Sequence, residues 1–379
     1  MAQRVVVLSS QLITTLSALA YLRWRGLRGT QLEVVSLYRD DLSHSTKAFQ
    51  PLLQDLAAQD GHQCLFIQTP PDQFGELRLR AGDNVLIGPE PLKCSLLLLP
   101  RLDDREGQQM LHVYQASEVV ELGESIGVET RLYSEQAKHN RIRALELVHR
   151  SPAMASVRLD PLVPFDRPVE LLRLQEMLNI CASFRRAFVD AEANLGPQVS
   201  GVLICLPYMR VPKWHVRLRL LGRSFGWRRA PGIENRAYFR RAISAALRPL
   251  QTDAPLRVQA HPKNETHHGL IERLLASLRP GRSWELLPAD DPLEVRLLRG
   301  WFGVGSERWP VLGFGTNLLA AAVFLSPHHQ GVGLCQPAEM GWWRRCSDPW
   351  LNRREWRRSH HVRAVLTNLL DALDQLQAQ

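Results

Sequence analysis

The sequence predicts an α/β protein with two consecutive domains, each built on a doubly wound parallel sheet. Short apolar runs alternate with helical patterns in both halves of the chain, which is typical of βαβ units. The length of 379 residues corresponds to about 2.5 domains of ordinary size. Residues 151–168 contain four prolines and separate the two halves, so this stretch is the best candidate for a linker.

The chain begins with an apolar stretch, residues 4–22, that resembles a membrane span or a signal peptide only superficially. It contains six Ser, Thr and Gln side chains and has no clear small-residue cleavage site. We therefore expect a buried strand, a short polar turn and a helix through Leu22. Further strands of this half are expected at residues 33–37, 63–67, 96–99 and 118–121, and helices at residues 46–59, 105–113 and 137–149.

The second half repeats the alternation after a long helix, which the pattern places at residues 168–192, before Gly196-Pro197. Strands are then expected at residues 201–206, 256–260 and 284–287, helices at residues 236–247 and 267–278, and an apolar segment at residues 311–325. Residues 362–376 carry leucines and valines on one helical face and predict an amphipathic helix. The expected divisions are an N-terminal domain (1–165), a linker with its connecting helix (166–198), a C-terminal domain (199–358) and a final helix (359–379).

Composition narrows the class of protein and the charge of its partners. Hydrophobic residues make up 45% and charged residues 22% of the chain, so a mainly disordered protein is excluded. The formal net charge of +9 favours a negatively charged partner, such as a nucleotide, an acidic glycan, a nucleic acid or an anionic membrane. Six cysteines occur without a Cys-x-x-Cys pair, so a zinc ribbon is unsupported and a reducing, cytoplasmic compartment is expected. The His-His pairs lack partner ligands at recognisable spacing, and no metal is expected.

A histidine follows directly on the expected strand at residues 256–260. Pro262 restricts the backbone of His261 to an extended conformation, which gives the imidazole a defined direction. Lys263 adds a second cation, and the next helix is expected to start near Thr266, where anions are favoured. The alternative is an ordinary loop histidine beside a turn proline.

A second candidate element for anion binding is the glycine-containing turn between residues 311 and 325. Gly315 allows a close approach of the backbone to a ligand, while Thr316 and Asn317 supply polar side chains at a helix start. The pattern predicts a small phosphate-binding turn, with a plain helix cap as the alternative. Glu294 lies between the strand at 284–287 and this turn, where a carboxylate can accept hydrogen bonds from ribose hydroxyls.

Polar residues also follow two strands of the first half. Ser9, Ser10 and Gln11 occupy the first strand-to-helix turn, where they either face a ligand or cap the helix. Glu121 and Glu124 follow the strand at 118–121, and a carboxylate at such a position is a candidate general base. A solvated acidic loop is the alternative.

Together and in this order, these elements resemble the bacterial polysialyltransferase and lipooligosaccharide sialyltransferase group of glycosyltransferases. The resemblance spans residues 4–325 and depends on the opening strand and Gln-containing turn, the acidic motif, His261-Pro262 and the hydroxyl motif near Thr316. Two positions depart from the group. Leu122 stands where the group has the base, and Asn317 replaces one hydroxyl of a paired motif.

The resemblance implies a GT-B fold, with two Rossmann-like domains facing a central cleft, and a bacterial, cytoplasmic enzyme of cell-surface polysaccharide synthesis. It implies inverting transfer of sialic acid, or a related nine-carbon acid, from CMP-sialic acid to a glycan, without metal or cofactor. Glu121 or Glu124 would take the proton of the acceptor hydroxyl, and His261 would stabilise the departing phosphate. The implied donor-binding residues are Ser10, Gln11, Pro262, Lys263, Glu294, Gly315, Thr316 and Asn317. The alternative function is a non-catalytic protein that binds polyanions or glycans on the same fold.

Two segments, residues 213–229 and 342–358, combine arginine with tryptophan. This combination suits an acidic glycan acceptor, single-stranded nucleic acid or an anionic membrane surface. No nucleic-acid-binding motif accompanies it. The alternative is a set of solvated surface arginines. The resemblance implies a nucleotide-sugar donor and a glycan acceptor as partners, and the expectation adds peripheral association at the inner face of the cytoplasmic membrane and no nucleic acid.

Overall fold

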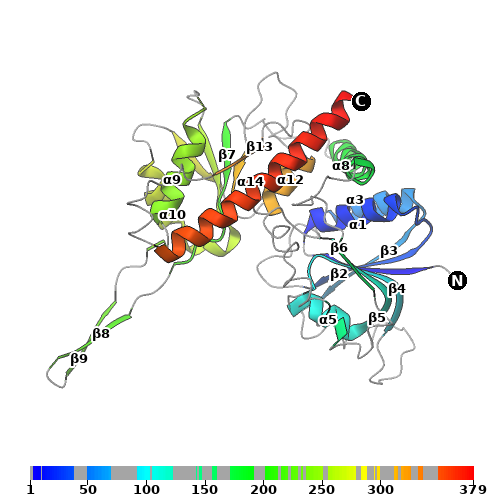
Figure 1. Cartoon of the computed structure of the whole chain (residues 1–379), viewed down its shortest axis with the longest axis horizontal. Helices are drawn as coiled ribbons and strands as arrows, with labels where there is room; N and C mark the ends of the chain where they lie inside the picture. Colours follow the sequence, from blue (N-terminus) through cyan, green and yellow to red (C-terminus); the bar gives the residue numbers. More distant parts are fainter. Residues whose placement is uncertain are drawn as a thin grey trace.

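The computed structural model contains two separate parallel sheets, each flanked by helices (Figure 1). It describes residues 3–9, 11–37, 49–69, 92–102, 105–122, 142, 145–146, 156–159, 171–191, 201–211, 215–220, 223–228, 232–233, 236–250, 255–278, 283–287, 294, 297–298, 311–314, 317–325, 332–335 and 349–379.

The first sheet has six strands in the order β3-β2-β1-β4-β5-β6. All neighbouring strands are parallel, and this order is typical of Rossmann folds. The strands are β1 (Arg4–Leu8), β2 (Gln31–Leu37), β3 (Gln63–Thr69), β4 (Leu92–Leu99), β5 (Tyr114–Glu121) and β6 (Ser156–Leu159).

The second sheet has five parallel strands in the order β11-β10-β7-β12-β13, which follows the same pattern around its own first strand. The strands are β7 (Val202–Cys205), β10 (Leu256–Gln259), β11 (Trp284–Leu287), β12 (Val311–Gly313) and β13 (Val332–Leu334). Because β1 and β7 lie in different sheets, the chain forms two Rossmann-like units. The expected fold class, an α/β protein of the GT-B type, is confirmed.

Burial on both faces explains why the strands are apolar throughout. In β1, Val5 and Val7 belong to one hydrophobic cluster while Val6 and Leu8 belong to another, and all four are at most 3% exposed. Successive side chains of a strand point to opposite faces, and helices cover both faces of a parallel sheet. Figure 1 shows α1 (Leu12–Trp24) and α3 (Gln50–Gln59) on one face of the first sheet and α5 (Arg105–Val113) on the other.

Helices also cover both faces of the second sheet. Buried residues of α9 (Arg236–Leu247) and α10 (His268–Ala276) cluster with Val202, Ile204 and Leu312 on one face. On the other face, α12 (Asn317–Leu325) joins the cluster that includes Leu203 and Val311. That second cluster continues into the first domain.

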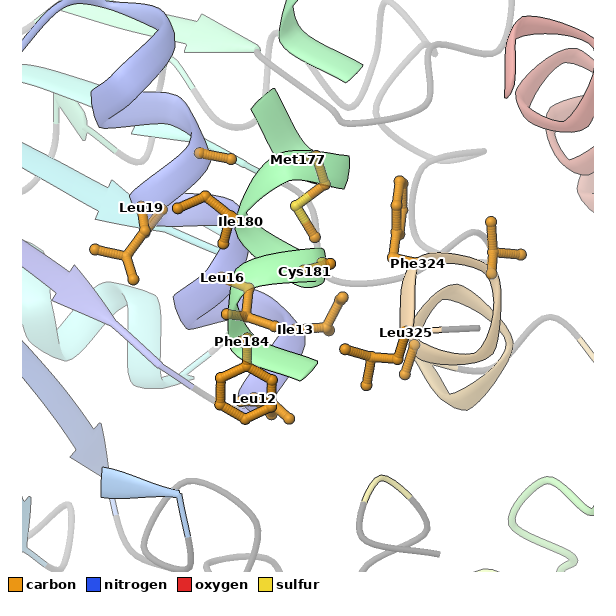
Figure 2. Close-up of a cluster of buried hydrophobic side chains, with 14 of the residues drawn as sticks. Leu12, Ile13, Leu16, Leu19, Met177, Ile180, Cys181, Phe184, Phe324 and Leu325 are labelled. Carbon is orange, nitrogen blue, oxygen red and sulfur yellow. The ribbon is translucent and has the colours of Figure 1, made fainter. Parts of the chain in front are cut away.

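The two domains share a buried core of three helices. Figure 2 shows α8 (Leu171–Ala191) between α1 and α12, with Met177 and Phe184 of α8 among the side chains of all three helices. Both side chains are fully buried. Arg185 donates a hydrogen bond of 3.0 Å to the Leu325 carbonyl, which satisfies a backbone acceptor at the end of α12. The connecting helix therefore joins the domains by packing and by hydrogen bonding.

The last helix, α14 (Pro349–Ala378), adds its apolar face to the same core. Val365, Leu369 and Leu373 are at most 1% exposed, which confirms the predicted amphipathic helix. The helix is longer than predicted, and the division expected between residues 358 and 359 falls inside it. No helix among the described residues is long and apolar enough to cross a membrane.

Two segments differ from the sequence-based expectations. The stretch expected to be a linker contains β6, a short edge strand paired with β5. Within residues 213–229, for which no strand was predicted, β8 (His215–Leu220) and β9 (Arg223–Arg228) form an antiparallel pair. The helix expected at residues 137–149 lies almost entirely outside the described residues.

Candidate functional site

Each sheet reverses its strand order at one point, and ligands of doubly wound sheets bind beyond the carboxyl ends of the strands there. In the first sheet the reversal lies between β2 and β4, around β1, and its carboxyl end leads into Ser9 and Gln11. In the second sheet it lies between β10 and β12, around β7. The loops after β7, β10 and β12 therefore form the first place to look for a ligand site.

His261 lies at this edge of the second sheet, two residues after β10 ends at Gln259. Its ring packs edge-to-face with Tyr208, from the loop after β7, with 5.7 Å between ring centroids. Tyr208 is 51% exposed and His261 is partly exposed. The two rings thus present a polar, aromatic surface beside the point where the strand order reverses.

A buried asparagine fixes the loop that carries His261. The side chain of Asn264 accepts a 2.8 Å hydrogen bond from the Met209 amide and donates a 2.7 Å bond to the Met209 carbonyl. The backbone amide of Asn264 also donates a 2.7 Å hydrogen bond to the backbone carbonyl of His261. Asn264, which is 1% exposed, thus satisfies both backbone polar groups of Met209, the residue next to Tyr208. One side chain therefore holds both loops, and with them both rings, in a fixed relative position.

Two buried polar side chains lie near Cys205, at the end of β7. Gln259 is 3% exposed and pairs in register with Cys205, and its Oε1 has no hydrogen-bond partner within the described part of the chain. Glu294 is 4% exposed, and burial raises the pKa of its carboxyl. Burial and then the charge of Glu294 raise the pKa of Cys205 to about 12, so this cysteine stays a neutral thiol. Burial of a hydrogen-bond acceptor or a carboxyl lowers the stability of the fold unless a partner forms hydrogen bonds with it.

The glycine turn after β12 is described in part. A Cβ on Gly313 would lie 3.1 Å from Leu319 Cδ1, so α12 packs closely against β12 at this glycine and a larger residue would require Leu319 to shift. Asn317 is the first residue of α12. The predicted phosphate-binding residues Gly315 and Thr316 lie outside the described residues. Their role stays a prediction.

The remaining candidates of this loop set are placed by their backbone. Pro262 and Lys263 begin a 3-10 helix, Pro262–His267, that leads directly into α10. The helical turn therefore starts closer to His261 than the sequence predicted. Their assignment to the donor also stays a prediction.

The corresponding edge of the first sheet is more enclosed. The hydroxyl oxygens of Ser9 and Thr15 lie 2.6 Å apart, and both residues are at most 2% exposed. Gln11 precedes α1 and makes no side-chain cap bond, and its Oε1 is buried without a hydrogen-bond partner among the described residues. Ser10 lies outside the described residues. The turn therefore uses Ser9 internally and leaves one acceptor of Gln11 for another partner.

Glu121, the candidate base, is fully buried at the end of β5. Its Oε1 accepts a 3.1 Å hydrogen bond from the Leu102 amide, and this bond ties the loop after β4 to β5. The next residue, Leu122, is also buried and donates its amide to the Leu99 carbonyl. Glu124, the other candidate, lies outside the described residues. The role of either carboxylate as a base stays a prediction.

The structure thus brings His261 together with Tyr208, and places Glu294 and Gln259 near Cys205 at the same sheet edge. Glu121 and Gln11 belong to the edge of the other sheet. Sequence reasoning missed Tyr208, Gln259 and Asn264. A polar residue ending an otherwise apolar strand could have marked Gln259, but the partners of Asn264 are 55 residues away, and no local pattern reveals them.

Comparisons with known proteins add little to this geometry. No protein-family model and no curated protein sequence matches the chain. Among solved structures, the chain is similar to Glycyrrhiza uralensis UGT73P12, solved in complex with glycyrrhetinic acid 3-O-monoglucuronide, at 9% sequence identity and a TM-score of 0.37. The match covers 100% of this chain and 95% of that chain. A similarity of this size carries no argument about activity, so the fold assignment rests on the two sheets of this chain.

Proposed function

We propose that this protein is a metal-independent glycosyltransferase of the sialyltransferase type. It transfers sialic acid, or a related nine-carbon acid, from a CMP donor to a glycan acceptor, with the active site in a cleft between the two domains. The single observation that carries the proposal is the position of His261. It lies on a loop held by Asn264, paired with Tyr208, at the carboxyl edge of a Rossmann-like sheet.

The second domain binds the donor in this proposal. Glu294 and the Oε1 atom of Gln259 are buried polar groups near the end of β7, where ribose hydroxyls and the cytosine amino group can supply donors. Asn317 begins α12, and the backbone amides of a helix N-terminus can bind the phosphate. Gln11, across the domain boundary, contributes an acceptor to the sugar.

The reaction is a displacement at the anomeric carbon. The acceptor oxygen forms the new bond, the bond to the phosphate oxygen breaks, and its electron pair leaves with CMP. His261 donates a hydrogen bond to the phosphate as that charge develops, which is an electrostatic role. Glu121 or Glu124 takes the proton of the acceptor hydroxyl, and attack from the face opposite CMP inverts the configuration.

A second candidate function is binding of a glycan or another polyanion without catalysis. One observation favours it: Glu121 is fully buried and hydrogen bonded to the Leu102 amide, while Leu122 occupies the position of the base in the resembling group. A protein of this kind would bind a nucleotide or glycan and release no product.

Calorimetry with the full chain tests the nucleotide preference. CMP is expected to bind at least about tenfold more tightly than UDP or ADP, which corresponds to about 1.4 kcal/mol of discrimination. UDP binding as tight as CMP binding would contradict the sialyltransferase proposal and indicate another sugar nucleotide. Release of CMP from CMP-sialic acid in the presence of an acidic glycan then separates the two candidates, because the non-catalytic protein binds without releasing CMP.

A further inference from the structure

The β8–β9 hairpin combines a regular backbone with an unusual composition. Residues 210–233 contain seven Lys or Arg residues and no Asp or Glu. Figure 1 shows the hairpin extending away from both domains. Among the described elements, its two strands make extensive backbone contact only with each other. An isolated two-stranded hairpin is marginally stable in water, so this one is expected to be completed by a partner.

The register of the hairpin separates apolar from basic residues. Paired residues of an antiparallel ladder share one face. One face therefore holds the pairs Val216–Trp227, Leu218–Phe225 and Leu220–Arg223, and the other holds His215–Arg228, Arg217–Gly226 and Arg219–Ser224. Five of the six residues on the first face are large and apolar. The second face has three arginines and a histidine.

We propose that this hairpin docks the protein on an anionic phospholipid membrane. At the boundary between acyl chains and headgroups, the apolar face is removed from water. Because the hairpin is a single layer, its basic face remains at the level of the phosphates. Tryptophan is favoured at this depth. Each strand has six residues, fewer than the 9–11 residues that a membrane-spanning strand needs, so the hairpin lies on the surface and does not span the bilayer.

The two-faced pattern distinguishes a membrane from a polyanion in solution. A nucleic acid or an acidic glycan would pair with the basic face and leave the apolar face in water. An anionic membrane matches both faces at once. The proposal does not depend on the proposed catalytic activity, because it concerns a surface on which no candidate site residue lies.

Sedimentation of the full chain with lipid vesicles tests the proposal. The wild type is expected to sediment with vesicles of phosphatidylcholine and phosphatidylglycerol, much less with phosphatidylcholine alone, and less as salt increases. Arg217→Gln with Arg219→Gln should weaken binding on the order of 20-fold, since each cation near an anionic surface contributes about fivefold. Leu218→Ser with Phe225→Ser should weaken it on the order of tenfold or more through lost apolar burial.

The matched control is Arg240→Gln with Arg248→Gln, which removes the same charge from exposed positions in and just after α9. It should bind vesicles nearly as well as the wild type. Equal losses in the control and in the hairpin variants would overturn the proposal, because net charge alone would then explain binding. Binding of single-stranded DNA or oligosialic acid that falls with the arginine variant, together with vesicle binding that survives the apolar variant, would also overturn it and assign the hairpin to a soluble polyanion. CMP affinity should stay unchanged in all variants. Failure of the membrane proposal can therefore be distinguished from failure of the proposed CMP-donor specificity.

Discussion

At the edge of the first sheet, Ser9 lies against Thr15, and Glu121 binds the Leu102 amide inside the protein. At the equivalent edge of the second sheet, the side chain of Asn264 is also used internally, and it supports the loop that carries His261. The topology of the two edges is the same, but their polar groups serve different purposes. Polar residues at equivalent strand ends can therefore have different roles: Glu121 ties the loop after β4 to β5, whereas Asn264 supports the loop that carries His261.

The largest expected effect concerns the general base. If the enclosure of Glu121 reflects a structural role, Glu124→Gln should lower turnover by about 10²–10⁴. Glu121→Gln should retain most activity, because the amide oxygen still accepts from Leu102. Donor consumption with an acidic glycan acceptor measures both. Loss of turnover in Glu121→Gln with an unchanged melting temperature would contradict a purely structural role of Glu121. Near-normal turnover in both variants would remove the carboxylate base and point to Leu122 as the mark of a non-catalytic site.

The next effect concerns His261. Removing one electrostatic donor from a transition state costs roughly 10²–10³ in rate. His261→Ala should therefore lower turnover by about this factor while CMP affinity changes little. His267→Ala is the matched control, because it removes a partly exposed imidazole from the end of the 3-10 helix that follows His261 and should leave turnover nearly unchanged. Equal turnover of the two variants would show that His261 has no special role.

A stability experiment compares the internal hydrogen bonds of the two edges. Asn264→Ala leaves the buried amide and carbonyl of Met209 without their partner and should lower the free energy of unfolding by about 2–4 kcal/mol. Ser9→Ala removes one neutral hydroxyl pair and should cost about 1 kcal/mol without a loss of turnover. Urea denaturation and donor consumption measure the two quantities. Asn264→Ala that is destabilised and yet turns over normally would show that its support of the His261 loop is not required for activity.

The smallest effect concerns Glu294 and depends on pH. Burial raises its pKa above the ordinary value of 4.5, so its contribution to folding is fully present below about pH 4.5 and is lost as pH rises through the raised pKa. Glu294→Gln cannot lose a proton, and its melting temperature relative to the wild type should therefore rise from pH 5 to pH 8. If Glu294 binds ribose, CMP affinity should fall about tenfold. An unchanged affinity would remove Glu294 from the nucleotide site, and a pH-independent difference in melting temperature would contradict the titration.

Local rules of sequence account for most of the fold. The continuous apolar run of Arg4–Leu8, buried on both faces, and the apolar stripe of the last helix follow from which side chains must leave water, so strand, helix and two-domain organisation were predictable. The position of His261 was predictable for the same reason, because it follows directly on a buried strand and precedes a proline. The length of the final helix was underestimated, because its first half is basic and lacks the apolar stripe that marked the second half.

Only the tertiary structure decided which distant segments meet. Ser156–Leu159 forms a sixth strand by pairing with Glu118–Glu121 of β5, which precedes it by a long stretch of chain. The local pairing of β8 with β9 was also not predicted. The bonds of Asn264 to Met209, the contact of Gly313 with Leu319 and the enclosure of Glu121 depend on that arrangement. Periodicity and steric preference act over a few residues and are readable in sequence. Whether a polar group is satisfied inside the protein depends on neighbours far along the chain, and that determines which candidate residues remain available for chemistry.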